Sequence, residues 1–205
     1  MFTRILKQTL RSVGLDLRRR PPAINHAYSG DVTGGRTKIH YGCGTVLLEG
    51  WLNVDLHVET VPGRSLRLNI TERHPFPDGT FAFAFSEDFF EHLEQQDQLI
   101  FLTEAYRTLQ AGGVLRLSCP CLDGVLKIHY SPGTLPVALK ARHEAYEQHE
   151  HRHFPAKEEL RLMGLHIGFR EVHFREFGES PYPELARLEV RENQRPVNLY
   201  AELVK

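Results

Sequence analysis

Two glycines and one carboxylate near residue 50 have the types and spacing of a ligand site. The short run KIHY ends in the turn Gly42-Cys43-Gly44, and Asp55 closes the next apolar run. Glycine lets the backbone approach a ligand without a Cβ in the way. A carboxylate at the end of a neighbouring strand can accept hydrogen bonds from both hydroxyls of a ribose. The pattern favours a nucleoside ligand, although a lone Gly-x-Gly turn is weak evidence by itself.

The spacing between this turn and Asp55 narrows the class of ligand. A dinucleotide fingerprint requires a third glycine where this sequence has Leu47. Only ten residues, 45–54, separate Gly44 from Asp55, whereas a helical crossover between parallel strands needs about a dozen or more. The helix N-terminus that would bind a pyrophosphate is therefore missing or stunted. A nucleoside without phosphates fits better, and S-adenosylmethionine is one. A dinucleotide or nucleotide-sugar enzyme is the weaker alternative.

A second polar group follows later apolar runs. Asn69 and Ile70 end the run SLRLNI, where an amide and an aliphatic side chain could border an adenine. Ser86 ends the run FAFAFS and Glu87 follows it. Because α/β sheets bind ligands at the carboxyl ends of their strands, we expect these residues near the glycine turn.

The elements that must position these residues alternate along the chain from residue 37. This alternation predicts a mostly parallel sheet with helical crossovers. The predicted strands are 38–42, 51–56, 65–70, 81–86, 114–120, 169–177 and 197–205, and the predicted helices are 94–113, 135–154 and 155–164. The first helix is expected to stop at the glycine pair 112–113. The segment 178–196 is long and rich in charge and proline, which is typical of a functional loop.

Three motifs in this order resemble the class I S-adenosylmethionine-dependent methyltransferases. The likeness is strongest to a small bacterial group of methyltransferase type 11-like sequences, and YGCGTVLLEGWLNVD has the form of that group's first motif. HPFPDGTFAFAFSEDFFEHL and EAYRTLQAGGVLRLSCP resemble two further blocks, so the likeness covers about residues 37–205. It implies an α/β fold: a Rossmann-like, mostly parallel sheet with helices on both faces, a shortened first crossover and an antiparallel last strand.

The resemblance also implies a role for each site residue. The glycine turn would border the methionine part of S-adenosylmethionine, and Asp55 would hold its ribose. Asn69 and Ile70 would contact the adenine, and Ser86 with Glu87 the methionyl end. The expected cofactor-binding set is Tyr41, Gly42, Cys43, Gly44, Asp55, Asn69, Ile70, Ser86 and Glu87.

This sequence departs from the family at four positions. His40 stands where many relatives have an acid, Ala82 replaces an aspartate, and Asp88 replaces a histidine. Asn69 also replaces an aspartate, although its amide oxygen can still accept a hydrogen bond from an adenine amino group. These departures motivate a second hypothesis, a non-catalytic binding or scaffold protein on the same fold.

Methyl transfer from a sulfonium needs few catalytic side chains, because proximity and in-line alignment carry most of the effect. A hydroxyl acceptor would still benefit from a base with a pKa near neutral, and His92, Asp123 and His153 are the candidates. His149, His151 and His153 recur at every second position. Three such histidines could hold a metal ion, but a polar loop is the favoured interpretation, and no metal is expected.

Length, charge and cysteine content limit the number of domains and the classes of partner that this protein can have. The 205 residues suffice for one buried domain, expected at 23–205. A formal net charge of −1 gives no electrostatic case for nucleic acid. No run approaches the roughly 18 apolar residues of a membrane span. Cys119 and Cys121 are too close for an unstrained disulfide, and the three cysteines are expected to be reduced, buried or loop thiols.

Residues 1–22 differ from the rest of the chain. Residues 1–20 hold six Lys or Arg and one acid, with apolar residues at helical spacing, and the pair Pro21-Pro22 follows. The pattern predicts a basic amphipathic helix and a hinge. Such a helix can contact an anionic membrane surface, or it can dock on its own domain or on a partner.

The leading hypothesis is therefore a cytoplasmic methyltransferase, in one version peripheral at the inner face of the membrane. The group that the sequence resembles often accompanies surface-polysaccharide synthesis. The resemblance thus implies a sugar hydroxyl, or a related small molecule, as the acceptor.

Overall fold

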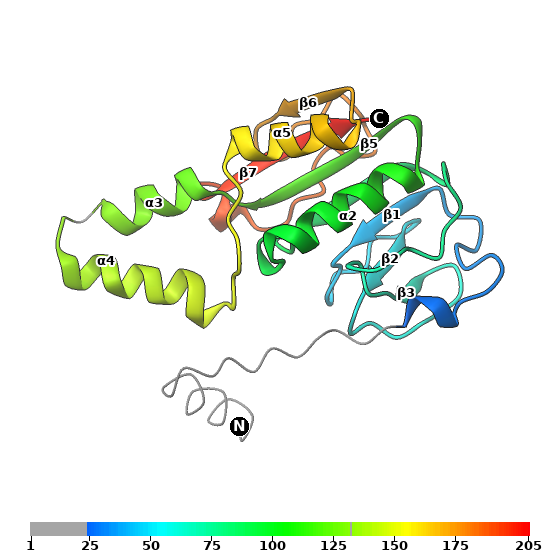
Figure 1. Cartoon of the computed structure of the whole chain (residues 1–205), viewed down its shortest axis with the longest axis horizontal. Coiled ribbons are helices and arrows are strands. Elements are labelled where there is room, and N and C mark those ends of the chain that lie inside the picture. Colours follow the sequence, from blue (N-terminus) through cyan, green and yellow to red (C-terminus); the bar gives the residue numbers. More distant parts are fainter. Residues whose placement is uncertain (1–23, 132) are drawn as a thin grey trace, which may run out of the picture.

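The computed structural model describes residues 24–131 and 133–205, so the predicted N-terminal helix and hinge lie outside the described residues. A seven-stranded sheet in the order β3-β2-β1-β4-β5-β7-β6 forms its centre (Figure 1). The strands are β1 (Lys38–Tyr41), β2 (Leu52–Asp55), β3 (Ser65–Arg67), β4 (Phe81–Glu87), β5 (Leu109–Pro120), β6 (Glu171–Phe174) and β7 (Asn198–Val204).

Strands β1 to β5 pair in parallel, and β7 lies antiparallel between β5 and β6. This arrangement confirms the predicted Rossmann-like sheet with an antiparallel last strand. Since β1 to β5 run the same way, their carboxyl ends share one edge of the sheet. That edge carries the glycine turn, defined here as residues 42–44, and Asp55.

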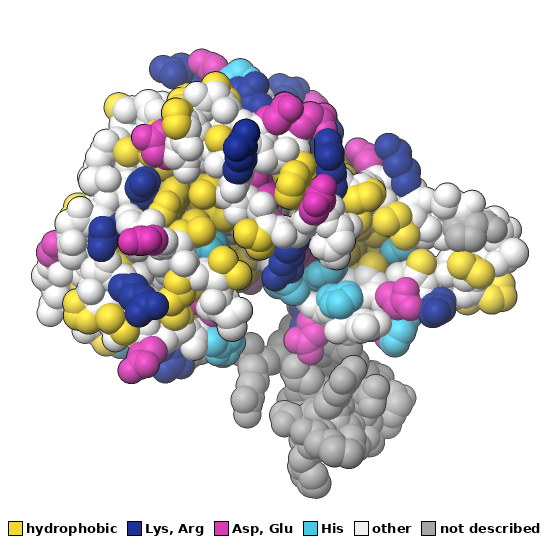
Figure 2. Space-filling view, turned by 180° about the vertical axis from the view of Figure 1, so that it is seen from behind, with side chains coloured by type: hydrophobic (Ala, Val, Ile, Leu, Met, Phe, Trp, Pro, Cys, Tyr) yellow, Lys and Arg dark blue, Asp and Glu magenta, His cyan; other side chains and the backbone are white. Residues whose placement is uncertain are grey.

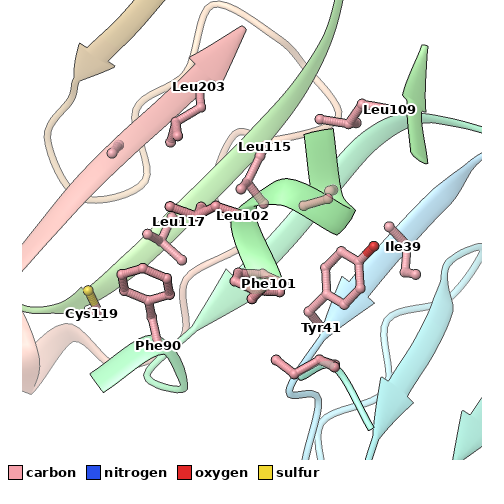
Figure 3. Close-up of a cluster of buried hydrophobic side chains, with 14 of the residues drawn as sticks. Ile39, Tyr41, Phe90, Phe101, Leu102, Leu109, Leu115, Leu117, Cys119 and Leu203 are labelled. Atoms are coloured by element: carbon pink, nitrogen blue, oxygen red, sulfur yellow. The ribbon is translucent and has the colours of Figure 1, made fainter. Parts of the chain in front are cut away.

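One face of the sheet is covered by two helices, α2 (Gln95–Thr108) and α5 (Lys157–Ile167), which contact each other (Figure 1). Alternate side chains of the strands point to these helices and form the main apolar core. Tyr41, Phe101, Leu102, Leu115 and Leu117 belong to it (Figure 3). This face therefore has the helical layer that the sequence predicted.

The opposite face differs from the prediction of helices on both faces. In the described residues it is covered by irregular chain. A smaller apolar cluster lies there and contains Phe85, Val114 and Val204 of the sheet together with Trp51 and Leu185. Leu185 belongs to residues 178–196, which we call the C-terminal segment. The first crossover is too short to supply a helix there. The long C-terminal segment covers the apolar side chains instead.

Asn53 closes the shortened crossover between β1 and β2. Its carboxamide oxygen accepts a hydrogen bond from the backbone N–H of Leu48 at 2.8 Å, and its Nδ2 donates to the carbonyl of Leu48 at 3.0 Å. Nδ2 also lies within hydrogen-bonding distance of the carbonyls of Trp51 and Arg64. Backbone groups that a helix would have paired are thus satisfied by one buried side chain.

The helix α2 ends at Thr108, four residues before the predicted glycine stop. Leu109 is already paired with Phe81 of β4, while Val114 pairs with Phe83, so residues 110–113 bulge out of β5. Gly112 supplies the positive φ of 77° in that bulge. The pairing of buried Leu109 with β4 therefore ends the helix before the glycine pair, although the local sequence predicts that the helix continues.

Two further helices, α3 (Leu122–Tyr130) and α4 (Leu135–Arg142), project beyond the sheet, and a π-helical segment, His143–Gln148, continues α4 (Figure 1). We call α3, α4 and this segment the arm. The helix predicted at 135–154 corresponds to α4 and its continuation, whereas α3 was not predicted. Short 3₁₀ turns lie at Asn25–Ala27, Phe90–His92 and Glu192–Gln194. Within the described ranges, no helix has the length and apolar character of a membrane span.

Candidate functional site

The glycine turn and Asp55 meet, as the sequence predicted. Gly42 and Gly44 both have positive φ angles, 64° and 50°, which glycine adopts without strain. The backbone N–H of Gly44 donates to Oδ2 of Asp55 at 3.1 Å, and that of His57 donates to Oδ1 at 2.8 Å. These two bonds fix the carboxylate against the turn. A carboxylate has about four acceptor sites, so capacity for two hydroxyl donors remains.

Phe89 packs directly on the glycine turn. A Cβ added to Gly42 would lie 2.3 Å from the Phe89 ring. The preceding residue, Asp88, has a positive φ of 47° and is held by its backbone N–H to the Ser118 carbonyl at 2.9 Å. The left-handed conformation of Asp88 therefore aims Phe89 at Gly42.

Tyr41 precedes the glycine turn and Cys43 is its middle residue, and both side chains are directed inward. Tyr41 is fully buried in the main core (Figure 3). Cys43 is buried, and burial raises the pKa of its thiol to about 12, so the thiol stays protonated. Only the backbone of these two residues is placed to contact a ligand on the turn.

Asn69 and Ile70 are both buried at the end of the third strand region. The carboxamide oxygen of Asn69 accepts hydrogen bonds from the backbone N–H and the hydroxyl of Thr71, at 3.1 Å and 2.9 Å. Asn25 binds the backbone of Asn69 through its carboxamide. Asn69 therefore orders the loop after β3.

Ser86 and Glu87 end β4 beside the C-terminal segment. Ser86 is fully buried, and its hydroxyl has no hydrogen-bond partner among residues 24–131 and 133–205. The Glu87 carboxylate accepts hydrogen bonds from the backbone N–H groups of Val190 and Arg191, at 3.1 Å and 3.3 Å. Burial raises the pKa of Glu87 above its ordinary value. Glu87 thus ties the C-terminal segment to the edge where the parallel strands end.

A cavity of about 440 Å³ opens at this edge, between the sheet, the arm and the C-terminal segment. We call it the histidine cavity. Figure 2 shows histidine side chains gathered where the body of the molecule meets the projecting arm. The residues that line the histidine cavity are Asp88, Glu91, His92, Pro120, Val125, Ile128, His129, Ala141, Glu144, Ala145, His149, His151, Phe154, Arg191, Gln194 and Val197.

Three titratable side chains converge on the wall of this cavity. Oε1 of Glu91 lies 3.8 Å from Nε2 of His92 and 3.8 Å from Nε2 of His151. Glu91 is 1% exposed, and burial raises its pKa to about 8. Burial lowers the pKa of His92, and it lowers that of His151 to about 4, so His151 is neutral at pH 7.

Of the three predicted base candidates, the structure places only His92 at the cavity. Asp123 is exposed in the first turn of α3 and does not line it. His153 contacts Glu159 of α5 instead, with 2.9 Å between Nε2 and Oε1. The alternating histidines do not converge as a trio, since the rings of His149 and His151 stack while His153 turns away.

Glu91 and His151 are the residues that sequence reasoning missed. Glu91 is part of the quoted SEDFFEHL block, and His151 is one of the alternating histidines. The two residues are 60 positions apart (151 − 91). Their contact depends on backbone bonds from Arg152 and His153 to the Glu91 carbonyl, at 2.8 Å and 3.2 Å. No local pattern predicts that contact.

Comparisons with known proteins agree with this fold. Residues 40–117 match a protein-family model described as a methyltransferase domain. This match spans the glycine turn, Asp55 and the end of β4. A search of curated proteins finds no match.

Similar solved structures include two methyltransferases of nearly the same extent. One is an S-adenosylmethionine-dependent methyltransferase from Archaeoglobus fulgidus, with a TM-score of 0.54 and 16% identity, covering 98% of this chain and 94% of that one. The other is an S-adenosylmethionine-dependent methyltransferase from Mesorhizobium loti, with a TM-score of 0.54 and 17% identity, covering 85% and 93%.

A third similar structure is a phosphoethanolamine N-methyltransferase from Haemonchus contortus in complex with S-adenosylhomocysteine. Its TM-score is 0.54 and its identity 16%, covering 86% of this chain and 50% of that one. At these identities the likeness establishes the fold. This chain has the fold of these methyltransferases, and its residues 40–117 match the methyltransferase domain model.

Proposed function

We propose that this protein is an S-adenosylmethionine-dependent methyltransferase that acts on a sugar hydroxyl of a surface polysaccharide or a related small molecule. The observation that carries the proposal is the bond between the Gly44 N–H and the Asp55 carboxylate at the edge where the parallel strands end. This geometry lies within the matched methyltransferase domain, at the edge where α/β sheets bind nucleosides.

The position of the cofactor follows from these contacts. Asp55 would accept hydrogen bonds from the ribose hydroxyls, and the backbone at Gly42 and Gly44 would border the methionine part. Phe89 touches Gly42, and its neighbours Asp88 and Glu91 line the histidine cavity. A methyl group carried on the turn would therefore lie close to that cavity, as in-line transfer requires. When bound, S-adenosylmethionine supplies the activated methyl group.

The histidine cavity suits a small polar acceptor. Its wall combines carboxylates, imidazoles and the guanidinium of Arg191 with the apolar faces of Val125, Ile128 and Phe154. A sugar presents hydroxyls to the polar groups and C–H faces to the apolar ones. The family resemblance of the sequence supports the same class of acceptor.

Glu91 and His92 are the side chains best placed to take a proton from an acceptor hydroxyl. Both line the cavity, and the pKa of Glu91, raised to about 8 by burial, is close to the operating pH. Proton transfer is most efficient when the pKa of the base is near that pH.

Calorimetric titration of S-adenosylmethionine into wild type and Asp55→Ala tests the cofactor site. We expect micromolar binding that weakens at least tenfold in the variant, about 1.4 kcal/mol. Glu49→Gln is a matched control, since Glu49 is an exposed acid in the same crossover, and its affinity should stay within about twofold of wild type. The proposal fails if wild type gives no saturable heat.

The second candidate is a binding or scaffold protein without catalysis. Phe89 lies over Gly42, and the carboxylate of Glu87 is occupied by backbone N–H groups, which favours a site closed to the cofactor. This candidate predicts no S-adenosylmethionine binding and unchanged function in Asp55→Ala. Measured methyl transfer from labelled cofactor to a panel of sugars would exclude it.

The proposed methyltransferase would work in the cytoplasm, and contact between residues 1–20 and the inner face of the membrane is part of the proposal. A basic helix near a membrane-bound glycan intermediate would bring the enzyme to its acceptor. Vesicle sedimentation tests this contact. Deletion of residues 1–20 should abolish binding to anionic vesicles, and unchanged binding would contradict it.

A further inference from the structure

We propose that Glu91, His92 and His151 bind one divalent transition-metal ion on the wall of the histidine cavity. Each residue offers one ligand atom, and the three atoms lie within 4.8 Å of one another. The comparisons indicate a methyltransferase domain and assign no metal to this chain.

The distances are close to those of a bound metal. Zn²⁺ holds imidazole nitrogens and carboxylate oxygens at about 2.0–2.2 Å, so two ligands of a tetrahedral ion lie about 3.4 Å apart. Oε1 of Glu91 is 3.8 Å from each histidine Nε2. The three ligand atoms lie within 4.8 Å of one another, so their separations would have to close by up to about 1.4 Å to reach the tetrahedral value, a shift that side-chain rotation can supply.

An unsatisfied carboxylate points to a missing ligand. Glu91 is 1% exposed, and its Oε2 atom has no hydrogen-bond partner among the described residues. A buried carboxylate oxygen without a partner costs free energy. A cation held by both carboxylate oxygens of Glu91, next to the two imidazoles, would remove that cost.

The surroundings favour a cation. The charged residues lining the cavity are Asp88, Glu91, Glu144 and Arg191, a formal charge of −2 (three acids and one base). The guanidinium of Arg191 lies 3.0 Å from the Asp88 carboxylate, which compensates its charge. With Asp88 compensated, the carboxylate of Glu91 is the group that a bound cation would neutralise.

The chemistry of the three donor atoms narrows the choice of ion. Nε2 of His92 and Nε2 of His151 both face the Glu91 carboxylate. Two imidazoles and one carboxylate select Zn²⁺ or a similar transition metal over Mg²⁺. This inference rests on the proposed function: with the ion bound, Glu91 and His92 would act as its ligands instead of as bases, and the ion would lower the pKa of the acceptor hydroxyl.

Zinc calorimetry and the visible absorption of bound Co²⁺ test the site on the full chain, first stripped with a chelator and without S-adenosylmethionine. We expect one equivalent of Zn²⁺ to bind, and Glu91→Gln and His151→Asn each to weaken binding at least tenfold. His149→Asn is the matched control, because His149 lines the same cavity outside the cluster, and it should leave the affinity within about twofold. Circular dichroism checks that each variant is folded.

Two outcomes overturn the metal site: no saturable binding of either ion by wild type, or equal binding by wild type and both cluster variants. Titration of S-adenosylmethionine separates this failure from failure of the proposed function. Cofactor binding without metal binding overturns the metal site alone. Metal binding without cofactor binding overturns the proposed methyltransferase alone.

Discussion

The glycine turn and the histidine cavity lie at the same edge of the sheet, but they are built in different ways. The glycine turn and Asp55 come from one stretch of chain, residues 42–55, joined by the bond from Gly44 to Asp55. The histidine cavity collects side chains from the turn after β4, from the end of β5, from the arm and the loop that follows it, and from residues 191–197 near the C-terminus. A local motif therefore encodes the first region, and tertiary packing assembles the second.

This difference extends to the ionisable groups. Next to the glycine turn, His40 is buried and its pKa is lowered to about 4, with Asn53 as its hydrogen-bond partner. In the cavity, Glu91 is buried with a pKa raised to about 8, and its Oε2 has no hydrogen-bond partner in the part of the chain that the structure describes. Pairing of polar groups stabilises the fold in the first region, whereas the second is the region where we propose that a ligand binds. Substitutions at three positions and one change of pH test this contrast.

Substitution of Arg116 should have the largest effect on stability, because Arg116 links β5 to the C-terminal segment. Arg116 and Glu189 are both fully buried and lie 2.6 Å apart, and Arg116 also donates to the carbonyl of Glu179. Arg116→Met leaves the buried carboxylate of Glu189 without its partner, so we expect urea unfolding to show a loss of about 3–5 kcal/mol. Arg161→Met, which breaks an exposed pair with Glu158, should have a much smaller effect, because solvent screens an exposed ion pair. Equal losses would contradict the anchoring role of Arg116.

Gly42→Ala should break the contact that joins the two regions. The added Cβ would lie 2.3 Å from the Phe89 ring at a positive φ of 64°, so we expect a loss of about 2–4 kcal/mol. Gly44→Ala has a positive φ but nothing within 4 Å of its Cβ, and it should cost only about 1 kcal/mol. A double-mutant cycle of Gly42→Ala with Phe89→Ala should show coupling of about 1–3 kcal/mol. Additive effects would show that the contact is absent in solution.

Acid should destabilise the region around the glycine turn. Burial lowers the pKa values of His40 and His74 to about 4, so between pH 6.5 and 4 the unfolded chain binds more protons than the folded one. Stability must then fall as the pH falls through this window, by about 2 kcal/mol per histidine at pH 5 relative to pH 7. Urea unfolding at both pH values measures the loss, and His40→Gln should reduce it. The exposed His166 provides the control, and a pH response in His40→Gln equal to that of His166→Gln would contradict the account.

Substitution of His153 should have the smallest effect. Its imidazole contacts Glu159 at 2.9 Å outside the cavity, and both side chains are partly exposed. We expect His153→Asn to lower the free energy of unfolding by less than about 1 kcal/mol and to leave methyl transfer unchanged, whereas His92→Asn should lower it. A larger loss of activity in His153→Asn than in His92→Asn would contradict the placement of the catalytic region at the histidine cavity.

The sequence predicted the glycine-turn region well for a physical reason. Positive φ at Gly42 and Gly44 and a carboxylate at the end of β2 are local requirements, and local requirements leave a local pattern. The short crossover was predicted by counting residues, and the structure adds that Asn53 satisfies its backbone.

The features that escaped prediction depend on contacts between distant residues. Helix α2 stops at Thr108 because Leu109 pairs with Phe81 on β4, which no window around residue 108 contains. Likewise, Glu91 meets His151 only after the loop before α5 bonds to the backbone of Glu91. The roles proposed for Asn69 and Ile70 toward an adenine stay predictions, since both are engaged in ordering the loop after β3.

A crystal structure with S-adenosylhomocysteine tests the central claim most directly, namely that the glycine turn holds the cofactor and the histidine cavity takes the acceptor. We predict the ribose hydroxyls at the Asp55 carboxylate and the sulfur beside Gly42, with Phe89 displaced or repacked and the sulfur facing the cavity that Glu91 lines. S-adenosylhomocysteine bound away from Asp55, or no bound ligand at saturating concentration, would contradict the claim.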